Sequence, residues 1–220
     1  MALAPPLARL NVALDLARRR AGDKAAGALE RIERESRRIN EMIGQLLTLI
    51  RGEGDAEGMR QETVDLSRLV TQVSEDADFE ARSQNRTVRV IACDDCRTMG
   101  TYALLRSAVE NVIRNAVRYT DEGTAVEVSL QCLDIVGDAY GIITVRDHGP
   151  GVPEETHADI FRPFYRVEEA RDPDSGGTGL GLAITARSVS LHNGTVRAFN
   201  APDRGLIVEM RIPVTGRPAS

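Results

Sequence analysis

One glycine-rich run constrains this chain more than any other stretch. Residues Gly176 to Leu182 read Gly-Gly-Thr-Gly-Leu-Gly-Leu, and a helical pattern of apolar residues follows at once. Glycine lets the backbone adopt positive φ and approach a ligand closely, while the free N–H groups and dipole of a helix N-terminus attract negative charge. The run therefore indicates either a phosphate-binding loop or a plain linker, and residues elsewhere in the chain must distinguish the two.

The composition is that of a soluble globular protein. The 220 residues include 28 basic and 33 acidic side chains, for a formal net charge of -5, and no tryptophan. We therefore expect no nucleic-acid partner, because neither a basic field nor a base-stacking platform is present. No apolar run approaches the roughly 20 residues of a membrane span. The three cysteines, including the C-x-x-C of Cys93 and Cys96, fit a reducing cytoplasm, and no nearby histidine completes a metal site.

The first quarter of the chain predicts two helices joined by a short break at Ala21 to Asp23. Apolar residues follow a helical stripe from Leu3 to Arg20 and a longer one from about Lys24 to Arg51. Such a hairpin covers its own apolar surface poorly, so we expect a second copy to complete a dimeric four-helix bundle. The alternative is that the stripe packs on the chain's own second domain. The predicted domains are a hairpin at 1–52, a glycine-rich linker at 53–61 and a second domain at 62–216.

The second domain is predicted to mix helices and strands. Helices are expected at 65–83, with Asp65 as the cap, and at 102–119 and 179–191. Strands are expected at 87–92, 97–101, 125–132, 140–146, 195–199 and 206–212. This order favours an α/β sandwich with helices on one face of a mixed sheet. The segment from His148 to Ser175 lacks periodicity, and a loop of that length in a compact domain is usually a functional lid.

The helix that ends at Tyr119 carries a polar face. Asn111, Asn115 and Arg118 lie at i, i+4 and i+7 and share that face. Asparagine is a poor helix former, but its carboxamide oxygen is a hard ligand that suits Mg²⁺. Arg118 can meet a phosphate, and Glu110 is a nearby carboxylate able to polarise an attacking group. The alternative is a solvated polar face without a ligand.

Two further motifs follow along the chain. The run Asp147-His148-Gly149-Pro150-Gly151 places a carboxylate at the end of a buried strand, where it suits a flat donor-rich ligand such as the amino edge of adenine. The segment from Phe161 to Arg166 sets aromatic residues beside cations inside the predicted lid. Such residues can close over a nucleotide and meet its phosphates, or they can anchor the loop on the core.

These four motifs, in this order, resemble the N, G1, F and G2 boxes of the histidine-kinase ATP-binding domain. That domain is a Bergerat-fold member of the family that includes gyrase and the Hsp90 chaperones, and the resemblance covers about Gln61 to Pro213. The lid and the glycine run look most like those of Cpx-type envelope-stress sensor kinases. The implied fold class is α+β: an antiparallel helical hairpin, half of a dimeric four-helix bundle, followed by a Bergerat-type α/β sandwich.

The resemblance implies a function and a set of site residues. It implies a protein histidine kinase that uses ATP and Mg²⁺, phosphorylates a histidine, and passes the phosphoryl group to an aspartate of a response-regulator receiver domain. The implied catalytic residues are Glu110, Asn111 and Arg118, and the implied Mg²⁺ ligand is Asn115. The implied nucleotide-binding residues are Asn111, Asn115, Arg118, Tyr119, Asp147, Gly149, Gly151, Phe161, Tyr165, Arg166, Gly177, Thr178, Gly179, Leu180 and Gly181.

The N-terminus departs from the family's pattern. The H box of these kinases begins His-Glu-Leu-Arg-Ser/Thr-Pro-Leu, and aligning it on Pro6 and Leu7 puts Met1 at the phosphoacceptor position. We therefore expect this polypeptide to bind ATP without phosphorylating itself at the usual site. It is then either the cytoplasmic portion of a sensor kinase anchored in the inner membrane or a short protein that regulates a partner.

Two other functions remain open on the sequence. One is an ATP-binding dimerisation or regulatory module without phosphotransfer. The other is a serine kinase of the anti-sigma type, which shares the ATP-binding fold but has no need of the helical hairpin.

Overall fold

A computed structural model describes Ile32 and residues 61–135, 137–167 and 178–215. The chain divides into two compact units, Met1–Leu47 and Thr48–Ser220. Of the predicted hairpin only Ile32 is described, and it is helical and about half exposed, at 48%. The hairpin, the linker and the boundary between them lie otherwise outside the described residues, so they stay predictions.

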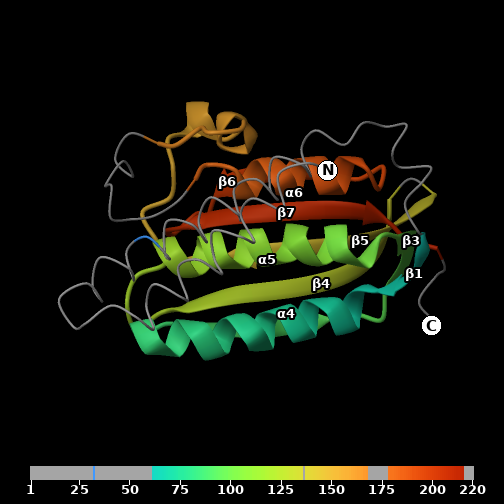
Figure 1. The fold of residues 1–220 in the computed structure, drawn as a ribbon, viewed down its shortest axis with the longest axis horizontal. Coiled ribbons are helices and arrows are strands. Elements are labelled where there is room, and N and C mark those ends of the chain that lie inside the picture. The colour runs from blue at the N-terminus through green and yellow to red at the C-terminus, as the bar shows by residue number, and fades with distance from the viewer. Residues whose placement is uncertain (1–31, 33–60, 136, 168–177, 216–220) are drawn as a thin grey trace. The chain divides into compact units, whose positions relative to one another are not determined.

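The second unit contains a five-stranded sheet with three helices on one face (Figure 1). Across the sheet the strands are β2 (Thr87–Cys93), β4 (Ala125–Ile135), β5 (Asp138–Arg146), β7 (Leu206–Pro213) and β6 (Thr195–Asn200). The helices are α4 (Leu66–Ala81), α5 (Tyr102–Tyr119) and α6 (Gly181–Ser190). Only β2 and β4 pair in parallel; the other pairs in this sheet are antiparallel. The predicted sandwich with helices on one face of a mixed sheet is confirmed.

One strand was not expected from the sequence. Residues Glu62–Asp65 form β1, which pairs antiparallel with β3 (Arg97–Gly100) in a separate two-stranded sheet. The sequence placed Thr63 and Val64 at the opening of the next helix, which is wrong, whereas Asp65 is its cap and Leu66 its first residue as expected. Four residues are too few for a clear alternation, and the pairing partner lies far along the chain.

The cap of α4 is confirmed. The Oδ1 atom of Asp65 accepts hydrogen bonds from the Arg68 N–H at 2.9 Å and the Ser67 hydroxyl at 2.6 Å. These bonds, that from the Arg68 N–H first, hold the pKa of Asp65 below its usual range. The carboxylate thereby satisfies one of the backbone donors that every helix start leaves open.

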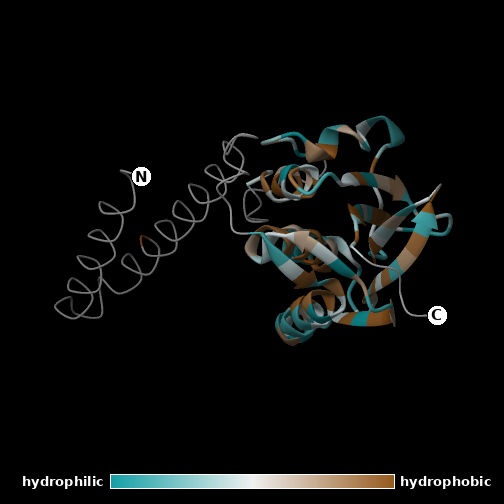
Figure 2. Cartoon of the chain, turned by 90° about the vertical axis from the view of Figure 1, so that its right-hand side faces the viewer, coloured by the Kyte–Doolittle hydropathy of each residue, from teal (hydrophilic) through white to brown (hydrophobic). Residues whose placement is uncertain are grey.

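The core lies between the sheet and the helices. Along β7 every second residue is buried, including Val208, Met210 and Ile212, and these side chains face the helices. The hydrophobic positions of the helices turn toward the sheet in the same way (Figure 2). The apolar residues at every second position of the strands therefore pack against the apolar stripe of α5, which repeats about every 3.6 residues.

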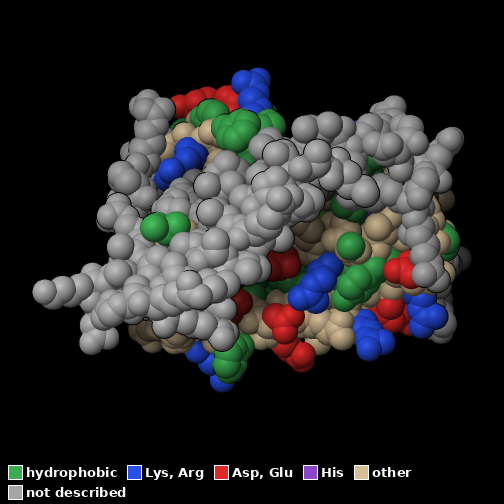
Figure 3. Space-filling view, in the orientation of Figure 1, with side chains coloured by type: hydrophobic (Ala, Val, Ile, Leu, Met, Phe, Trp, Pro, Cys, Tyr) green, Lys and Arg blue, Asp and Glu red, His purple; other side chains and the backbone are tan. Residues whose placement is uncertain are grey.

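The outer face of the sheet is polar. Its strands carry ion pairs, including Arg197 with Glu209 at 2.9 Å on neighbouring strands. Figure 3 shows the opposite face, seen from the side of the helices, where acidic and basic side chains of the described residues are interspersed and do not form one basic field. Among the described residues, no helix combines the length and apolar character required of a membrane span.

A buried histidine joins α6 to the start of α5. The Nε2 atom of His192 accepts the Thr101 N–H at 3.0 Å, and Nδ1 lies 2.6 Å from the carbonyl oxygen of Ser188. The two contacts require a neutral ring that donates from Nδ1. Thr101 is the N-cap residue of α5, so His192 satisfies the backbone N–H immediately before that helix.

We expect His192→Phe to destabilise the domain by about 2–4 kcal/mol, because a slightly larger aromatic ring replaces the imidazole while a part-buried N–H and a buried C=O lose their partners. Urea denaturation measures the loss. The matched control is Ser190→Ala, an exposed change near the end of α6, which should shift stability by no more than about 0.5 kcal/mol. Equal midpoints for the two variants would contradict the role of His192.

Candidate functional site

The candidate site is built around Asp147, the residue that follows β5. Its side chain is 4% exposed, and Oδ1 accepts the backbone N–H groups of Gly149 at 2.9 Å and Leu206 at 3.1 Å. Burial raises the pKa of Asp147, and these two backbone bonds lower it again in part. The other oxygen, Oδ2, makes no hydrogen bond to any described residue. The carboxylate is thus fixed by one oxygen and presents an acceptor with the other.

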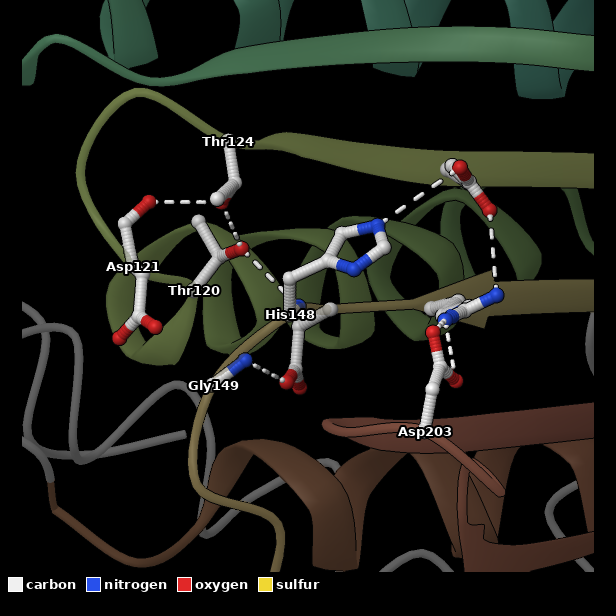
Figure 4. Close-up of polar contacts among 9 residues, drawn as sticks. Thr120, Asp121, Thr124, His148, Gly149 and Asp203 are labelled. Carbon is white, nitrogen blue, oxygen red and sulfur yellow. Dashed lines mark hydrogen bonds and ion pairs between the residues drawn. The ribbon is translucent and has the colours of Figure 1, made fainter.

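The residues on either side of Asp147 are held by a polar network (Figure 4). The His148 N–H donates to the Thr120 hydroxyl at 3.1 Å, and that hydroxyl lies 2.7 Å from the hydroxyl of Thr124. The His148 ring lies 3.6 Å from Glu127. These contacts tie the loop after β5 to the end of α5 and to β4.

The turn between β6 and β7 supports the same loop from the other side. The Arg146 guanidinium donates to Asp203 at 2.6 Å and holds the pKa of that exposed carboxyl below its usual range. Gly205 has φ +99°, and a Cβ added there would lie 1.9 Å from the Asp147 carbonyl oxygen. The turn therefore packs directly on the backbone of Asp147, and only glycine fits at this contact.

Asn200 clamps the end of the loop. Its Oδ1 accepts the Val152 N–H at 3.0 Å and its Nδ2 donates to the Val152 carbonyl at 2.7 Å. Gly151, with φ +75°, packs against the same side chain, because a Cβ there would lie 2.7 Å from Asn200 Oδ1. Sequence analysis missed Asn200, Asp203 and Gly205. The only signal was a turn-forming Asp-Arg-Gly between two predicted strands.

We expect Asn200→Asp to cost about 1–3 kcal/mol of stability, because the Val152 carbonyl loses its donor and faces a carboxylate oxygen. Chemical denaturation of the variant measures this loss. Asn193→Asp is the matched control: Asn193 is exposed and has positive φ, which aspartate also tolerates. A loss of similar size in the control would show that the clamp is not the cause.

The predicted asparagine helix meets the glycine run. Gly181 begins α6, and a Cβ added to it would lie 3.3 Å from Asn111 Oδ1 on α5. The Thr185 hydroxyl donates to the Ala108 carbonyl at 3.1 Å, which holds the two helices together one turn further on. Asn111 and the positive end of α6 are therefore neighbours, as a shared anion-binding site requires.

The same helix also meets the Asp147 loop. A Cβ added to Gly149 would lie 2.2 Å from the Tyr119 carbonyl oxygen, so glycine is required for the close approach. The Arg118 guanidinium stacks on the Tyr119 ring at 5.4 Å. The Nη2 atom of Arg118 is buried and has no hydrogen-bond partner among the described residues. A buried, unpaired guanidinium nitrogen fits an anionic ligand.

The aromatic segment contacts the glycine run as well. The Phe164 N–H donates to the Gly179 carbonyl at 2.9 Å, and a Cβ on Gly179 would lie 2.9 Å from the Phe164 backbone. Phe161 and Tyr165 pack against the core, as the anchoring alternative predicts, whereas Phe164 is 58% exposed. Sequence analysis did not single out Phe164, whose φ of +63° is uncommon for an aromatic residue.

The remaining predicted residues differ in exposure and in partners. Glu110 pairs with Arg114 at 3.6 Å, and both are substantially exposed. Asn115 and Arg166 are half-buried, and the Thr178 hydroxyl accepts the Leu180 N–H at 3.4 Å. Gly177 lies outside the described residues. The structure therefore brings together Asn111 with Gly181, Tyr119 with Gly149, and Phe164 with Gly179.

No carboxylate cage for a metal is present in the described part of the chain. Groups of three or more His, Cys, Asp or Glu side chains at metal-binding geometry do not occur there. Asn115, predicted as a Mg²⁺ ligand, lies one turn beyond Asn111 on the same face of α5.

Comparisons with known proteins agree with this arrangement. Residues 100–216 match the family described as Histidine kinase-, DNA gyrase B-, and HSP90-like ATPase. The sensor histidine kinase CpxA of Escherichia coli (strain K12) is 40% identical over 217 residues, which cover 98% of this chain and 45% of CpxA. The chain thus spans about half the length of the curated relatives it matches.

Two solved structures show the same fold. The mycobacterial sensor histidine kinase MprB is 27% identical, with a TM-score of 0.61, over 73% of this chain and all of that one. Full-length ShkA in complex with AMPPNP is 22% identical, with a TM-score of 0.75, over 99% of this chain and 46% of that one, a likeness of fold alone. The chain belongs to the histidine kinase-, DNA gyrase B- and HSP90-like ATPase family and contains the ATPase catalytic domain of sensor histidine kinases.

Proposed function

We propose that this domain binds ATP together with Mg²⁺ and, within a longer sensor kinase, supplies the γ-phosphoryl group for a histidine. The observation that carries the proposal is the position of Asp147, buried at a strand end with one oxygen fixed by two backbone N–H groups and the other available. A fixed acceptor of this kind matches the 6-amino group of adenine. The family match and the ShkA complex with AMPPNP support the same ligand.

The phosphates would lie between α5 and the start of α6. The first N–H groups of α6 and the unpaired Nη2 of Arg118 offer positive charge there, and the glycines at 179 and 181 let the backbone approach. Asn115, with Asn111 beside it, would hold the Mg²⁺ ion, which neutralises phosphate charge during phosphoryl transfer. Such a transfer depends mainly on positioning and charge neutralisation, which these residues supply.

The finer roles rest on the relatives. CpxA and MprB are named sensor histidine kinases, and from their names we propose a homodimer through the helical hairpin, a response-regulator receiver domain as the phosphoryl acceptor, and a cytoplasmic position in a membrane-anchored protein. Glu110, on the exposed side of α5, is the proposed group that polarises the attacking histidine. We further propose that the chain with Met1 at the acceptor position does not label itself.

Phosphotransfer is tested with γ-labelled ATP and two proteins. One is this chain; the other carries Met1→His and is extended upstream with the preceding residues of the longer protein. Acid-labile, base-stable label on the second protein alone supports the proposal. ATP binding by both proteins with label on neither would favour an ATP-binding dimerisation or regulatory module instead.

We expect the affinity for ATP to fall as the pH is lowered through the raised pKa of Asp147, because a protonated carboxyl no longer accepts from the adenine amino group. The fall should begin at a higher pH than an ordinary aspartate would give. Stability should change in the opposite sense: burial raises the pKa in the folded state, so protonation there favours folding. Calorimetric titrations of ATP over a pH series check the first effect, and denaturation over the same series checks the second.

A further inference from the structure

Two cysteines from distant parts of the sequence occupy one region of the core. Cys96, in the connection between β2 and β3, is 1% exposed and belongs to the hydrophobic core. Cys132, on β4, is partly buried and packs against the same core. Cys132 lies two residues after the fully buried Leu130 on the same strand, so the side chains of Leu130 and Cys132 point to the same, helical face of the sheet.

The backbone segments that carry the two cysteines are fixed side by side. Cys93 is in register with Leu130, and the Asp94 N–H donates to the Leu130 carbonyl at 3.0 Å. The Asp94 carboxylate accepts the Cys132 N–H at 2.9 Å, which continues the pairing by one more step. On its other side, Cys96 accepts the Leu66 N–H at 2.9 Å through its carbonyl. The connection therefore cannot swing away from β4.

The Cys132 thiol also affects the titration of Cys96. Burial first, and then the contact with the Cys132 thiol, raise the pKa of Cys96. The third cysteine points elsewhere, because the Cys93 thiol donates to the Ser67 carbonyl of α4 at 3.7 Å. The pair that the structure brings together is Cys96 with Cys132, whereas the C-x-x-C spacing in the sequence had drawn attention to Cys93 with Cys96.

We propose that Cys96 and Cys132 form a reversible intramolecular disulfide when the protein meets a hydroperoxide. The sulfur of Cys132, the more accessible of the two, takes one oxygen from hydrogen peroxide to give a sulfenic acid, and the other oxygen leaves as water. The Cys96 sulfur then attacks the Cys132 sulfur, the S–O bond breaks, and the departing hydroxide leaves as water with the proton of Cys96. In sum, two thiols are oxidised and one peroxide is reduced to two waters.

The crosslink encloses the whole of α5. The segment from Cys96 to Cys132 contains Asn111, Asn115 and Arg118, so the disulfide would restrict the helix that carries these candidate nucleotide-binding residues. A disulfide that closes a loop of this size stabilises mainly by restricting the unfolded chain, and we expect the melting temperature to rise by roughly 5 °C. A thiol reductant would reverse the change.

The experiment treats the full chain with hydrogen peroxide and compares it with three variants: Cys93→Ser, Cys96→Ala and Cys132→Ser. The original chain and Cys93→Ser should each lose about 2 Da, the mass of two hydrogen atoms, and recover it with dithiothreitol. Cys96→Ala and Cys132→Ser should show no such loss. Peptide mapping without reductant should find Cys96 joined to Cys132.

Other outcomes would overturn the proposal. Mapping that joins Cys93 to Cys96, or loss of the crosslink in Cys93→Ser, would assign the chemistry to the C-x-x-C spacing. Oxidation that yields only sulfinic acid, only disulfide-linked dimers, or no product would show that the two thiols cannot meet. Cys132→Ser tests the pair without changing a fully buried side chain, so a folding failure of Cys96→Ala alone would not obscure the result.

Discussion

Asp147→Asn should lower the affinity for ATP by about 100-fold or more while leaving the domain folded. The asparagine Oδ1 can still accept the backbone N–H groups of Gly149 and Leu206, which preserves the loop. The Oδ2 atom of the aspartate is replaced, however, by the Nδ2 amide group of asparagine, which is a donor and would face the donor amino group of adenine. Loss of a charge-assisted hydrogen bond and creation of an unpaired buried donor together account for the size of the effect.

Two measurements separate this effect from a loss of structure. Calorimetric titration gives the affinity for Mg·ATP, and the thermal midpoint reports the fold. The matched control is Asp138→Asn, an exposed change at the opposite end of β5, which should alter neither. An Asp147→Asn protein that binds ATP normally would remove the basis of the proposed adenine contact.

Gly205→Ala should destabilise the domain by roughly 3–5 kcal/mol and weaken nucleotide binding at the same time. The new Cβ would lie 1.9 Å from the Asp147 carbonyl oxygen and 2.7 Å from its carbonyl carbon. Both are backbone atoms, so no side chain can move aside to relieve the clash. The loop that carries the carboxylate must shift, and stability and affinity therefore fall together.

Gly123→Ala is the matched control for the conformational part of this cost. Gly123 also has positive φ, at +77°, but a Cβ there would meet nothing within 4 Å. Its replacement should cost only the strain of a left-handed residue, about 1–2 kcal/mol. Urea denaturation of both variants separates strain from contact. Equal losses would mean that the packing of the turn on Asp147 contributes nothing.

The sequence predicted those parts of the fold that follow from local pattern. Helix α5 has its expected bounds, because a long apolar stripe of helical period between turn residues leaves little freedom. Strand β1 was missed because four residues cannot show a pattern, and because its partner β3 lies beyond α4 and β2. Pairing across such a separation is a tertiary effect that local propensity does not contain.

The residues of the candidate site were likewise predictable only in part from the sequence. Asp147, Asn111 and the glycines stood out because those residue types in those patterns suit ligand chemistry. The residues that support them, Asn200 and Gly205, did not stand out, because each contacts residues roughly fifty positions away in the chain. A single asparagine or a turn glycine is common in any protein, and only the fold shows which backbone it holds.

Recognition of the amino edge of adenine by Asp147 is tested directly by one competition between nucleotides. Affinities for ATP and for inosine triphosphate, which carries an oxygen in place of the 6-amino group, are measured on the original chain and on Asp147→Asn. We expect the original chain to prefer ATP by about 10-fold or more, since its carboxylate would otherwise face an acceptor, and we expect the variant to lose this preference. Equal affinity of the original chain for the two nucleotides would contradict it.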